Sequence, residues 1–552
     1  MASRLRLVHE PPLHGPIEDL PRARAATPPA RQHPMALHRL DVIAIVLYFA
    51  LTAVIGLCAT RARTTSLELF LAGRSLGPLA VGFSLFSSNM SSDTLLGLPG
   101  AAYRSGISVA NYEWMASLTL VVSSFLILPL LLRARISTIP EFMERRFDVR
   151  LRKYLSGTAL LLVLVVDTAG ALYAGSLVLR TFVPGLQLQH ATQAIALFTA
   201  AYTAAGGLRA VVYTDVMQTV VLLLGSAALA WIVFGKFGFS WGEVLQRVPA
   251  EHLHLLRPGD DPGVPWIGLL TGVPVACMYY WNLNQHIAQR VLAARDLPAA
   301  SRGAMIAAAL KLLPLFLMTL PGAMAIPLLP DLQQADQVWP TMVARFAPPG
   351  MAGVILAGLL AALMSTCSAT LNSAATLLSA DFVRPAFPRI STRHLALFGR
   401  VATLLFALAA GTWAPVIQHF AGLWAYLQEM MAYVVSPILA LFALGLTCPS
   451  FGASAALRTL VSAHAASALL FAAKLAGWLE FHFAVVGGVV FAITGLLALP
   501  WLLLQRRADR PPPHGGQLAL VRRDNLPRLP RDVRIAALLV LLGVAAQLLY
   551  FR

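Results

Sequence analysis

Charged side chains are scarce in this sequence. Only 12% of its 552 residues are charged and 58% are hydrophobic, whereas soluble domains carry roughly 25% charged residues. This shortage excludes an ordinary soluble domain. Long apolar runs account for it, for example residues 40–59 and 533–551, and each is close to the ~20 residues that a helix needs to cross the hydrocarbon core. We therefore expect an integral membrane protein whose surroundings are the lipid bilayer.

Cysteine and acidic residues are also few. The four cysteines have no paired spacing, which argues against a disulfide framework or a cysteine metal site. Basic residues exceed acidic ones by 42 to 25, but they gather in short segments between apolar runs instead of forming one face. That distribution is typical of membrane topology and not of nucleic-acid binding. Nothing in the sequence indicates a nucleic-acid partner, an organic cofactor or an obligatory protein partner.

The first 34 residues lack an apolar stretch, which excludes a signal peptide. They are rich in proline and arginine, so we expect a disordered tail, or a stretch that precedes a true start at Met35. Residues 35–552 are expected to form a single domain.

Hydropathy predicts fourteen membrane-spanning helices, centred near residues 50, 89, 123, 166, 198, 223, 275, 316, 365, 404, 433, 464, 494 and 542. Alternate connections, such as residues 61–74 and 133–153, are rich in lysine and arginine, whereas the intervening ones carry few. The positive-inside rule places the basic connections in the cytoplasm and both termini outside. We expect a multi-pass protein of the cell membrane, and of a bacterial inner membrane in particular.

One predicted span is interrupted by polar residues. The stretch SLFSSNMSSDTLLGLPG, residues 84–100, places serines, an asparagine and an aspartate at membrane depth. Such side chains compete with helical backbone hydrogen bonds, so we expect the helix to unwind between Ser87 and Thr94. Irregular backbone at this depth must be buried in protein or line a cavity, and its free carbonyl oxygens suit a hard cation. A packing face of small residues is the alternative.

A second hydroxyl-rich stretch, LAALMSTCSATLNSAATLLSAD at residues 360–381, could complete such a site. Ala362, Ser365 and Thr366 stand at i, i+3 and i+4 and therefore share one helical face. Two hydroxyls and a carbonyl there, opposite two or three carbonyls of the unwound segment, would form a five-oxygen cage for Na⁺. Helix packing is again the alternative.

Charged residues inside predicted spans are functional candidates, because a charge at the bilayer centre costs at least ~2.5–3.5 kcal/mol. Asp167 and Lys311 lie deepest, and for them we expect a functional role or mutual charge pairing. The alternative to that pairing is that Asp167 meets a cationic group on the substrate. Glu113 and Asp215 lie near predicted helix ends, where solvation or capping is the alternative. The remaining candidates are Asp93 and Glu429.

Several longer motifs resemble those of the sodium:solute symporter family, which includes the sodium/glucose and sodium/galactose cotransporters. Residues 72–117 are similar to its first core helix, ISTIPEFMERRF (136–147) to its cytoplasmic signature, and YTAAGGLRAVVYTDVMQ (202–218) to its Gly-Gly-Leu…Thr-Asp block. YYWNLNQHIAQRVLAA (279–294) and LMSTCSATLNSAATLLSAD (363–381) resemble two further blocks. The resemblance implies an all-α membrane fold of about fourteen helices with a five-plus-five inverted repeat, like that of the bacterial leucine transporter. The two repeats would cover about residues 79–236 and 265–447.

The resemblance also implies a sodium site and a substrate site. The family's aspartate on the fifth core helix, implicated in sodium exit or in a second sodium site, corresponds to Asp215. The sodium ligands correspond to the backbone carbonyls of Ser87, Met90 and Ala362 and to the hydroxyls of Ser365 and Thr366.

Substrate contacts of the sugar branch correspond to eight positions, to which the neighbouring aromatic Trp281 is added. Four of them match that branch, which is typical of a pocket for a polyol: Glu113, Tyr280, Lys311 and Gln428. Four depart from it, and because a site built on hydrogen bonds discriminates sharply, they weaken the case for galactose: Thr94, Ala116, Cys277 and Asp167.

The sequence therefore predicts a secondary active transporter that couples inward Na⁺ flux to uptake of a small organic solute, a sugar or polyol, by alternating access. A sodium symporter for an organic acid or amino acid, and a transporter-like sensor without transport, are the alternatives. We do not expect an enzyme, because the predicted spans contain no HExxH, no GxSxG and no histidine pair at ligand spacing.

Overall fold

The computed structural model describes residues 38–59, 71–183, 185–205, 208–261, 263–420, 422–507 and 528–552. The expected tail of residues 1–34 lies outside these ranges. Within them the chain is helical, with isolated β-bridges and no strand. The all-α class predicted from hydropathy is confirmed.

The described helices form rods that follow the fourteen predicted spans. Nine segments of the described chain satisfy both the length and the hydropathy expected of a membrane span. Among the other rods, α3 with α4 and α13 with α14 are divided into helices too short to meet the length criterion. In chain order the rods are α1 (Arg39–Ala59), α3 and α4 (Pro78–Asn89, Ser92–Ser105), α5 and α6 (Asn111–Leu126, Leu128–Arg133), α8 and α9 (Val149–Leu162, Ala169–Phe182), α10 (Leu188–Ala205), α11 (Leu208–Gly235), α13 and α14 (Trp266–Leu270, Gly272–Asn282), α16 and α17 (Leu297–Leu310, Leu320–Met324), α19 (Met351–Leu377), α21 (Thr392–Trp413), α22 (Leu423–Thr447), α23 (Ala453–Leu475), α24 (Phe483–Arg507) and α25 (Arg531–Tyr550).

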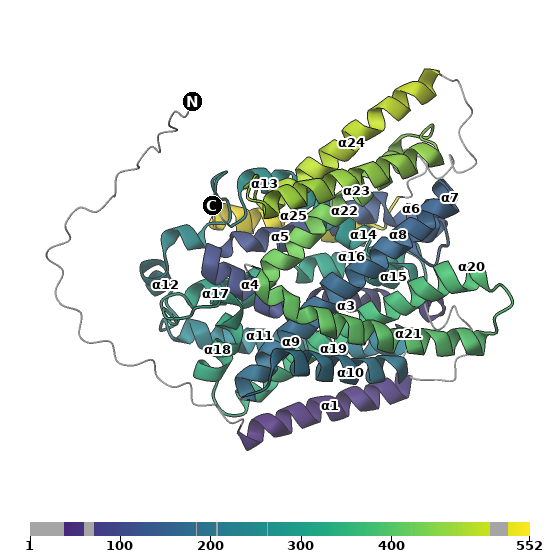
Figure 1. The fold of residues 1–552 in the computed structure, drawn as a ribbon. Coiled ribbons are helices and arrows are strands. Elements are labelled where there is room, and N and C mark those ends of the chain that lie inside the picture. Colours follow the sequence, from purple (N-terminus) through teal and green to yellow (C-terminus); the bar gives the residue numbers. More distant parts are fainter. Residues whose placement is uncertain are drawn as a thin grey trace, which may run out of the picture.

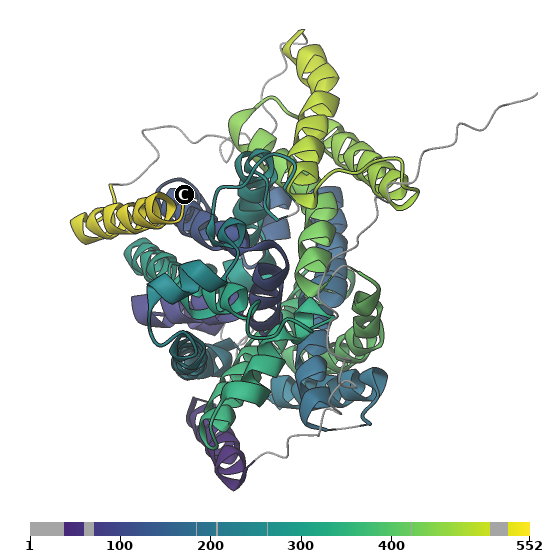
Figure 2. The same cartoon turned by 90° about the vertical axis from the view of Figure 1, so that its left-hand side faces the viewer.

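The broken rod of α3 and α4 lies inside the bundle. α3 packs against α11, α16 and α19, and α4 against α17 and α22. α1 and α24 lie on opposite sides of the bundle, and α25 stands at its margin (Figure 1; Figure 2). The outward face of α25 exposes Leu538, Leu542 and Leu549, as expected of a helix that contacts lipid. Polar residues are therefore concentrated where the rods meet and not on the outside.

Two carboxylates fix the helices that border the interior. Asp41 of α1 accepts hydrogen bonds from the backbone N–H groups of Gly350 and Gly353, at 2.8 and 2.7 Å, at the N-terminal end of α19. Asp336, in the connection before α18 (Val338–Phe346), accepts the N–H of Leu423 at 3.0 Å at the start of α22. These three bonds satisfy amide donors that a helix N-terminus leaves free. They hold the starts of α19 and α22 in place.

Three of the helical rods that the structure describes contain a π-helical segment, which inserts an extra residue into a turn and is frequent at functional sites. These segments are η3 (Val163–Thr168) between α8 and α9, η5 (Leu315–Thr319) between α16 and α17, and η7 (Leu378–Val383) after α19. Asp167 belongs to the first of them. The deeply placed carboxylate predicted from the sequence therefore sits on an irregular turn.

Candidate functional site

The polar stretch at residues 84–100 breaks its helix at Met90 and Ser91. α3 ends at Asn89 and α4 begins at Ser92. The side chain of Ser91 accepts the backbone N–H of Thr94 at 3.3 Å and so caps α4, a role for which serine is favoured. The interruption predicted from the sequence is confirmed, although it is shorter than the expected range of Ser87 to Thr94.

The break removes the amide partners of two backbone carbonyls. In a continuous helix the N–H of Ser91 would donate to the carbonyl of Ser87, but it donates to Asn89 instead, at 2.9 Å. The N–H of Thr94 would donate to the carbonyl of Met90, but it is taken by the Ser91 side chain. Both carbonyls predicted to bind sodium therefore lose the donor that a regular helix would supply.

A polar chain joins α3, α11 and α19 beside the break. Ser87 donates to the hydroxyl of Ser365 at 3.1 Å, and Ser365 donates to Asp215 at 2.6 Å. The other oxygen of Asp215 accepts from Ser84 at 2.5 Å and from Arg290 at 3.1 Å. Asp215 is fully buried, and a buried charge needs compensation. The Arg290 guanidinium and the Ser84 and Ser365 hydroxyls supply it.

Thr366 is different from its neighbour. Its hydroxyl oxygen is buried and has no hydrogen-bond partner in the part of the chain that the structure describes. Met90 and Ala362 are also buried, with 0% exposure. Leaving a buried hydroxyl unsatisfied costs about 1–3 kcal/mol. The Thr366 hydroxyl oxygen on α19 is therefore available to bind a ligand next to the helix break.

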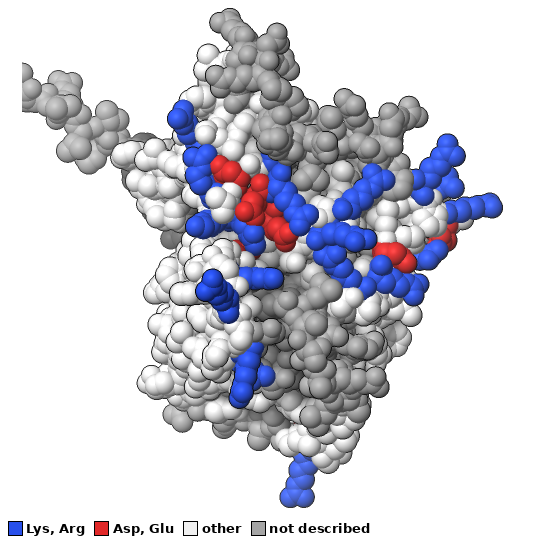
Figure 3. Space-filling view, turned by 90° about the vertical axis from the view of Figure 1, so that its right-hand side faces the viewer, with Lys and Arg blue, Asp and Glu red and all other residues white. Residues whose placement is uncertain are grey.

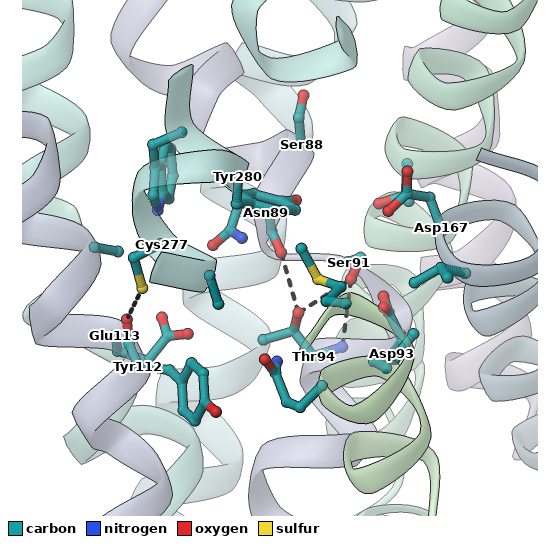
Figure 4. Close-up of a pocket in the computed structure, with 18 of the residues that line it drawn as sticks. Ser88, Asn89, Ser91, Asp93, Thr94, Tyr112, Glu113, Asp167, Cys277 and Tyr280 are labelled. Atoms are coloured by element: carbon teal, nitrogen blue, oxygen red, sulfur yellow. Dashed lines mark hydrogen bonds between the residues drawn. The ribbon is translucent and has the colours of Figure 1, made fainter. Parts of the chain in front are cut away.

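One cavity beside the break brings the predicted substrate residues together (Figure 4). Its wall is formed by side chains of α3, α4, α5, η3, α14, α16, α19 and α22. Tyr280 and Trp281 give it an aromatic corner, with ring centroids 5.7 Å apart at 74°. All of the candidate substrate residues line it: Thr94, Glu113, Ala116, Asp167, Cys277, Tyr280, Trp281, Lys311 and Gln428.

Lys311 pairs with Glu113 and not with Asp167. Its ammonium group donates to Glu113 Oε2 and to Asn89 Oδ1, and it lies 5.7 Å from the centre of the Trp281 ring. The pairing of Asp167 with Lys311, one of the two expectations for these residues, is wrong. The reason is packing: α16, which precedes Lys311, lies against α3 and α5, whereas the segment η3 that carries Asp167 lies against α19 and α21.

Asp167 faces histidine instead. Its Oδ2 atom lies 3.6 Å from Nδ1 of His286, which belongs to α15 (Gln285–Leu292). The other ring nitrogen of His286 is 3.3 Å from the hydroxyl of Tyr280. The cavity thus has a Lys311 side and an Asp167 side, and Tyr280 contacts the Asp167 side through His286.

Three residues of this region were not among the predicted site residues: Asn89, His286 and Arg290. Arg290 could have been predicted from the sequence, because a buried carboxylate such as that of Asp215 needs a cationic partner. Asn89 lies in the polar stretch that the sequence marks, but its contact with Lys311 depends on the packing of α16 against α3. His286 gave no comparable signal, since only the packing of α15 against α3 brings it to the cavity.

Comparison with known proteins identifies this arrangement. The sequence profile described as the sodium:solute symporter family matches residues 69–462, which include the broken helix, α19 and the whole cavity wall. The chain belongs to the sodium:solute symporter family. Relatives include sodium/myo-inositol cotransporter 2 of Oryctolagus cuniculus, which is 32% identical over 474 residues, covering 79% of this chain and 68% of the relative. The sodium/glucose cotransporter of Vibrio parahaemolyticus is 33% identical over 439 residues, covering 74% and 80%.

Solved structures show the same fold. A Na⁺-coupled sialic acid symporter in a substrate-bound, outward-open state superposes with a TM-score of 0.72 at 22% identity, covering 84% of this chain and 98% of that one. Mhp1, a nucleobase-cation-symport-1 family transporter, gives a TM-score of 0.53 at 17% identity, covering 85% and 97%. The leucine-transporter-like fold is confirmed. This symporter is a multi-pass membrane protein that couples transport of a small solute to Na⁺, and its relatives are named as transporters and not as enzymes.

Proposed function

We propose that the symporter holds Na⁺ between the helix break and α19, and that this ion drives uptake of a sugar or cyclitol by alternating access. Ser87, Met90 and Ala362 would contribute backbone carbonyls, and Ser365 and Thr366 their hydroxyls. The observation that carries this proposal is the loss of amide donors at the Ser87 and Met90 carbonyls. These free acceptors lie in the segment that faces α19, where Thr366 has an unsatisfied hydroxyl. Five neutral oxygens suit a hard monovalent cation.

Asp215 is proposed to act in sodium exit. It accepts from Ser365, so release of Na⁺ from the Ser365 hydroxyl and rearrangement of the Asp215–Arg290 pair are directly linked. One charge that falls through 100 mV provides ~2.3 kcal/mol. This supports roughly fifty-fold accumulation of the solute, because ~1.4 kcal/mol corresponds to a factor of ten.

A polyol is the substrate class that the cavity favours. Glu113, Lys311 and Gln428 offer charged and amide groups that can bind hydroxyls, and Trp281 offers an apolar face. The relatives named above are cotransporters of glucose and myo-inositol. An organic acid is disfavoured, because the single lysine of the described cavity wall is already paired with Glu113.

The proposed orientation has the termini outside a bacterial inner membrane. Lysine and arginine gather on the side of the molecule formed by α8, the neighbouring α7 (Ile139–Arg146) and α20 (Arg384–Ala386) (Figure 3). The start of α1 and the C-terminus lie on the opposite side (Figure 1). The positive-inside rule would make the basic side cytoplasmic.

Uptake by purified protein in proteoliposomes tests the proposed function. Radiolabelled D-glucose, D-galactose and myo-inositol would be compared with succinate and proline, each with and without an inward Na⁺ gradient. We expect Na⁺-dependent accumulation of at least one sugar or cyclitol. Uptake of proline or succinate alone would reject the polyol class, and binding without uptake would indicate a sensor. Uptake that ignores the gradient would reject sodium coupling.

A further inference from the structure

Two carboxylates of the cavity lack a cationic partner. Oδ1 of Asp93 and Oδ2 of Asp167 are buried and have no hydrogen-bond partner among the residues described. The side chains are enclosed, since Asp93 is 9% exposed and the Asp167 side chain 11% exposed. Both line the cavity, and Figure 4 shows them on the same side of it, away from Glu113. Asp93 packs against Gly170, which stands three residues after Asp167 on the same helical rod.

The charges of the wall do not balance. Glu113 and Lys311 form a pair that cancels, which leaves Asp93 and Asp167. Sodium in its proposed cage would offset one negative charge and leave the other. His286 is a poor counter-ion for Asp167, because it is 1% exposed on its side chain and its carbonyl oxygen accepts a bond from the guanidinium of Arg290. A proton on that ring would bring a second buried positive charge next to the first.

Local structure explains only part of this acidity. Asp93 stands in the first turn of α4, where the helix dipole favours a carboxylate. Asp167 lies in the interior of a continuous helical rod, within η3, and its neighbours are the neutral Asn284 amide and the His286 ring, 3.6 Å away. A carboxylate kept at membrane depth without a cationic partner is costly. The missing partner is therefore expected to arrive with a ligand.

We propose that the transported solute is a hydroxylated amine, such as an amino sugar or an aminocyclitol, whose ammonium group binds between Asp93 and Asp167. The hydroxyls of the same molecule would face the Lys311 side of the cavity. An ammonium group offers three donors, and hydrogen bonds between charged partners are about twice as strong as neutral ones. This inference rests on the proposed function and narrows its substrate class.

Matched solutes test it on the unmodified protein. D-glucosamine, D-glucose and N-acetyl-D-glucosamine share one ring, and 1-amino-1-deoxy-scyllo-inositol and myo-inositol share another, so each set isolates the charge. In proteoliposomes with a Na⁺ gradient we expect the amine of at least one set to have a half-saturating concentration about tenfold lower than its neutral partner. We also expect its uptake to carry one more charge per molecule. Neutral solutes transported as well as their amines would overturn the inference and leave the proposed function standing. No uptake of any of them would overturn the inference, and the proposed function would then stand only if D-galactose is taken up with Na⁺.

Charge-removing variants locate the effect. Asp93→Asn and Asp167→Asn should raise the half-saturating concentration of the amine about tenfold and change that of the neutral partner less than threefold. Asp261→Asn is the matched control, because Asp261 pairs with Arg257 outside the cavity. Thermal midpoints of the purified variants check that they are folded. If the two variants instead lower the number of Na⁺ ions moved with a neutral solute, the pair holds a second coupling cation and the inference is wrong.

Discussion

Thr366 is the residue on which the sodium assignment can be tested most directly. Its hydroxyl has no partner in the described structure, so Thr366→Ala removes a potential ligand without breaking an observed bond. A hydrogen bond or ligand contact to a charged group contributes about 1.5–3 kcal/mol. We therefore expect the half-saturating Na⁺ concentration to rise about tenfold or more, measured by uptake in proteoliposomes at fixed solute.

Ser436→Ala provides the control for that variant. The Ser436 hydroxyl donates to the carbonyl of Ala432 in its own helix, at 2.8 Å, and the residue is not part of the cavity wall. Its removal should leave the sodium dependence unchanged. Equal sodium affinity in the Thr366 variant and the control would contradict the proposed cage.

The Glu113–Lys311 pair makes a second prediction, which concerns stability. Removing one member of a buried ion pair leaves an uncompensated charge and costs about 3–5 kcal/mol, whereas an apolar or neutral replacement of both is often tolerated. Glu113→Gln alone and Lys311→Met alone should each lower the thermal midpoint of the detergent-solubilised protein. The double variant should recover most of the loss while remaining deficient in uptake. A double variant as unstable as the sum of the singles would show that the two side chains do not act as a pair.

At this scale the sequence predicts what is local. The i, i+3 and i+4 spacing of Ala362, Ser365 and Thr366 is fixed by one helix, and the structure keeps them on α19. The partner of Lys311 is set by how α16 packs against α5, which no spacing encodes. For this reason the sequence cannot distinguish Asp167 from Glu113 as the partner of Lys311, and the structure pairs Lys311 with Glu113.

At the scale of whole elements, α4 and α17 approach so closely that only glycine fits. A Cβ on Gly322 would lie 2.5 Å from the Cα of Pro99, and α4 borders the cavity. Gly322→Ala should force the two helices apart and lower stability by about 1–3 kcal/mol, read as a lower thermal midpoint. Gly157→Ala in α8 is the matched control, since a Cβ there meets nothing within 4 Å, and alanine is favoured over glycine by about 1 kcal/mol inside a helix. An unchanged thermal midpoint in Gly322→Ala would show that α4 and α17 can accommodate the added methyl group without loss of stability.

Hydropathy and polarity locate the elements but not their irregularities. The sequence predicts the break because serine and asparagine oppose helix formation at membrane depth, and in the structure the Ser91 side chain caps the helix that begins at Ser92. The π-helical segments were not predicted, because one extra residue in a turn leaves the hydropathy of a span unchanged. η3 nevertheless carries Asp167 and sets where its carboxylate points.

For the whole molecule, the distribution of charge predicts how the chain sits in the membrane. The basic side lies around α7 and α20, opposite the start of α1 and the C-terminus (Figure 1; Figure 3). An epitope tag after Arg552 should therefore be reached by antibody in intact spheroplasts. A tag inserted between Pro388 and Arg389 should be reached only after the membrane is permeabilised, and both tagged proteins should retain Na⁺-dependent uptake as the control for folding. The reverse staining pattern would mean that the basic side faces outward.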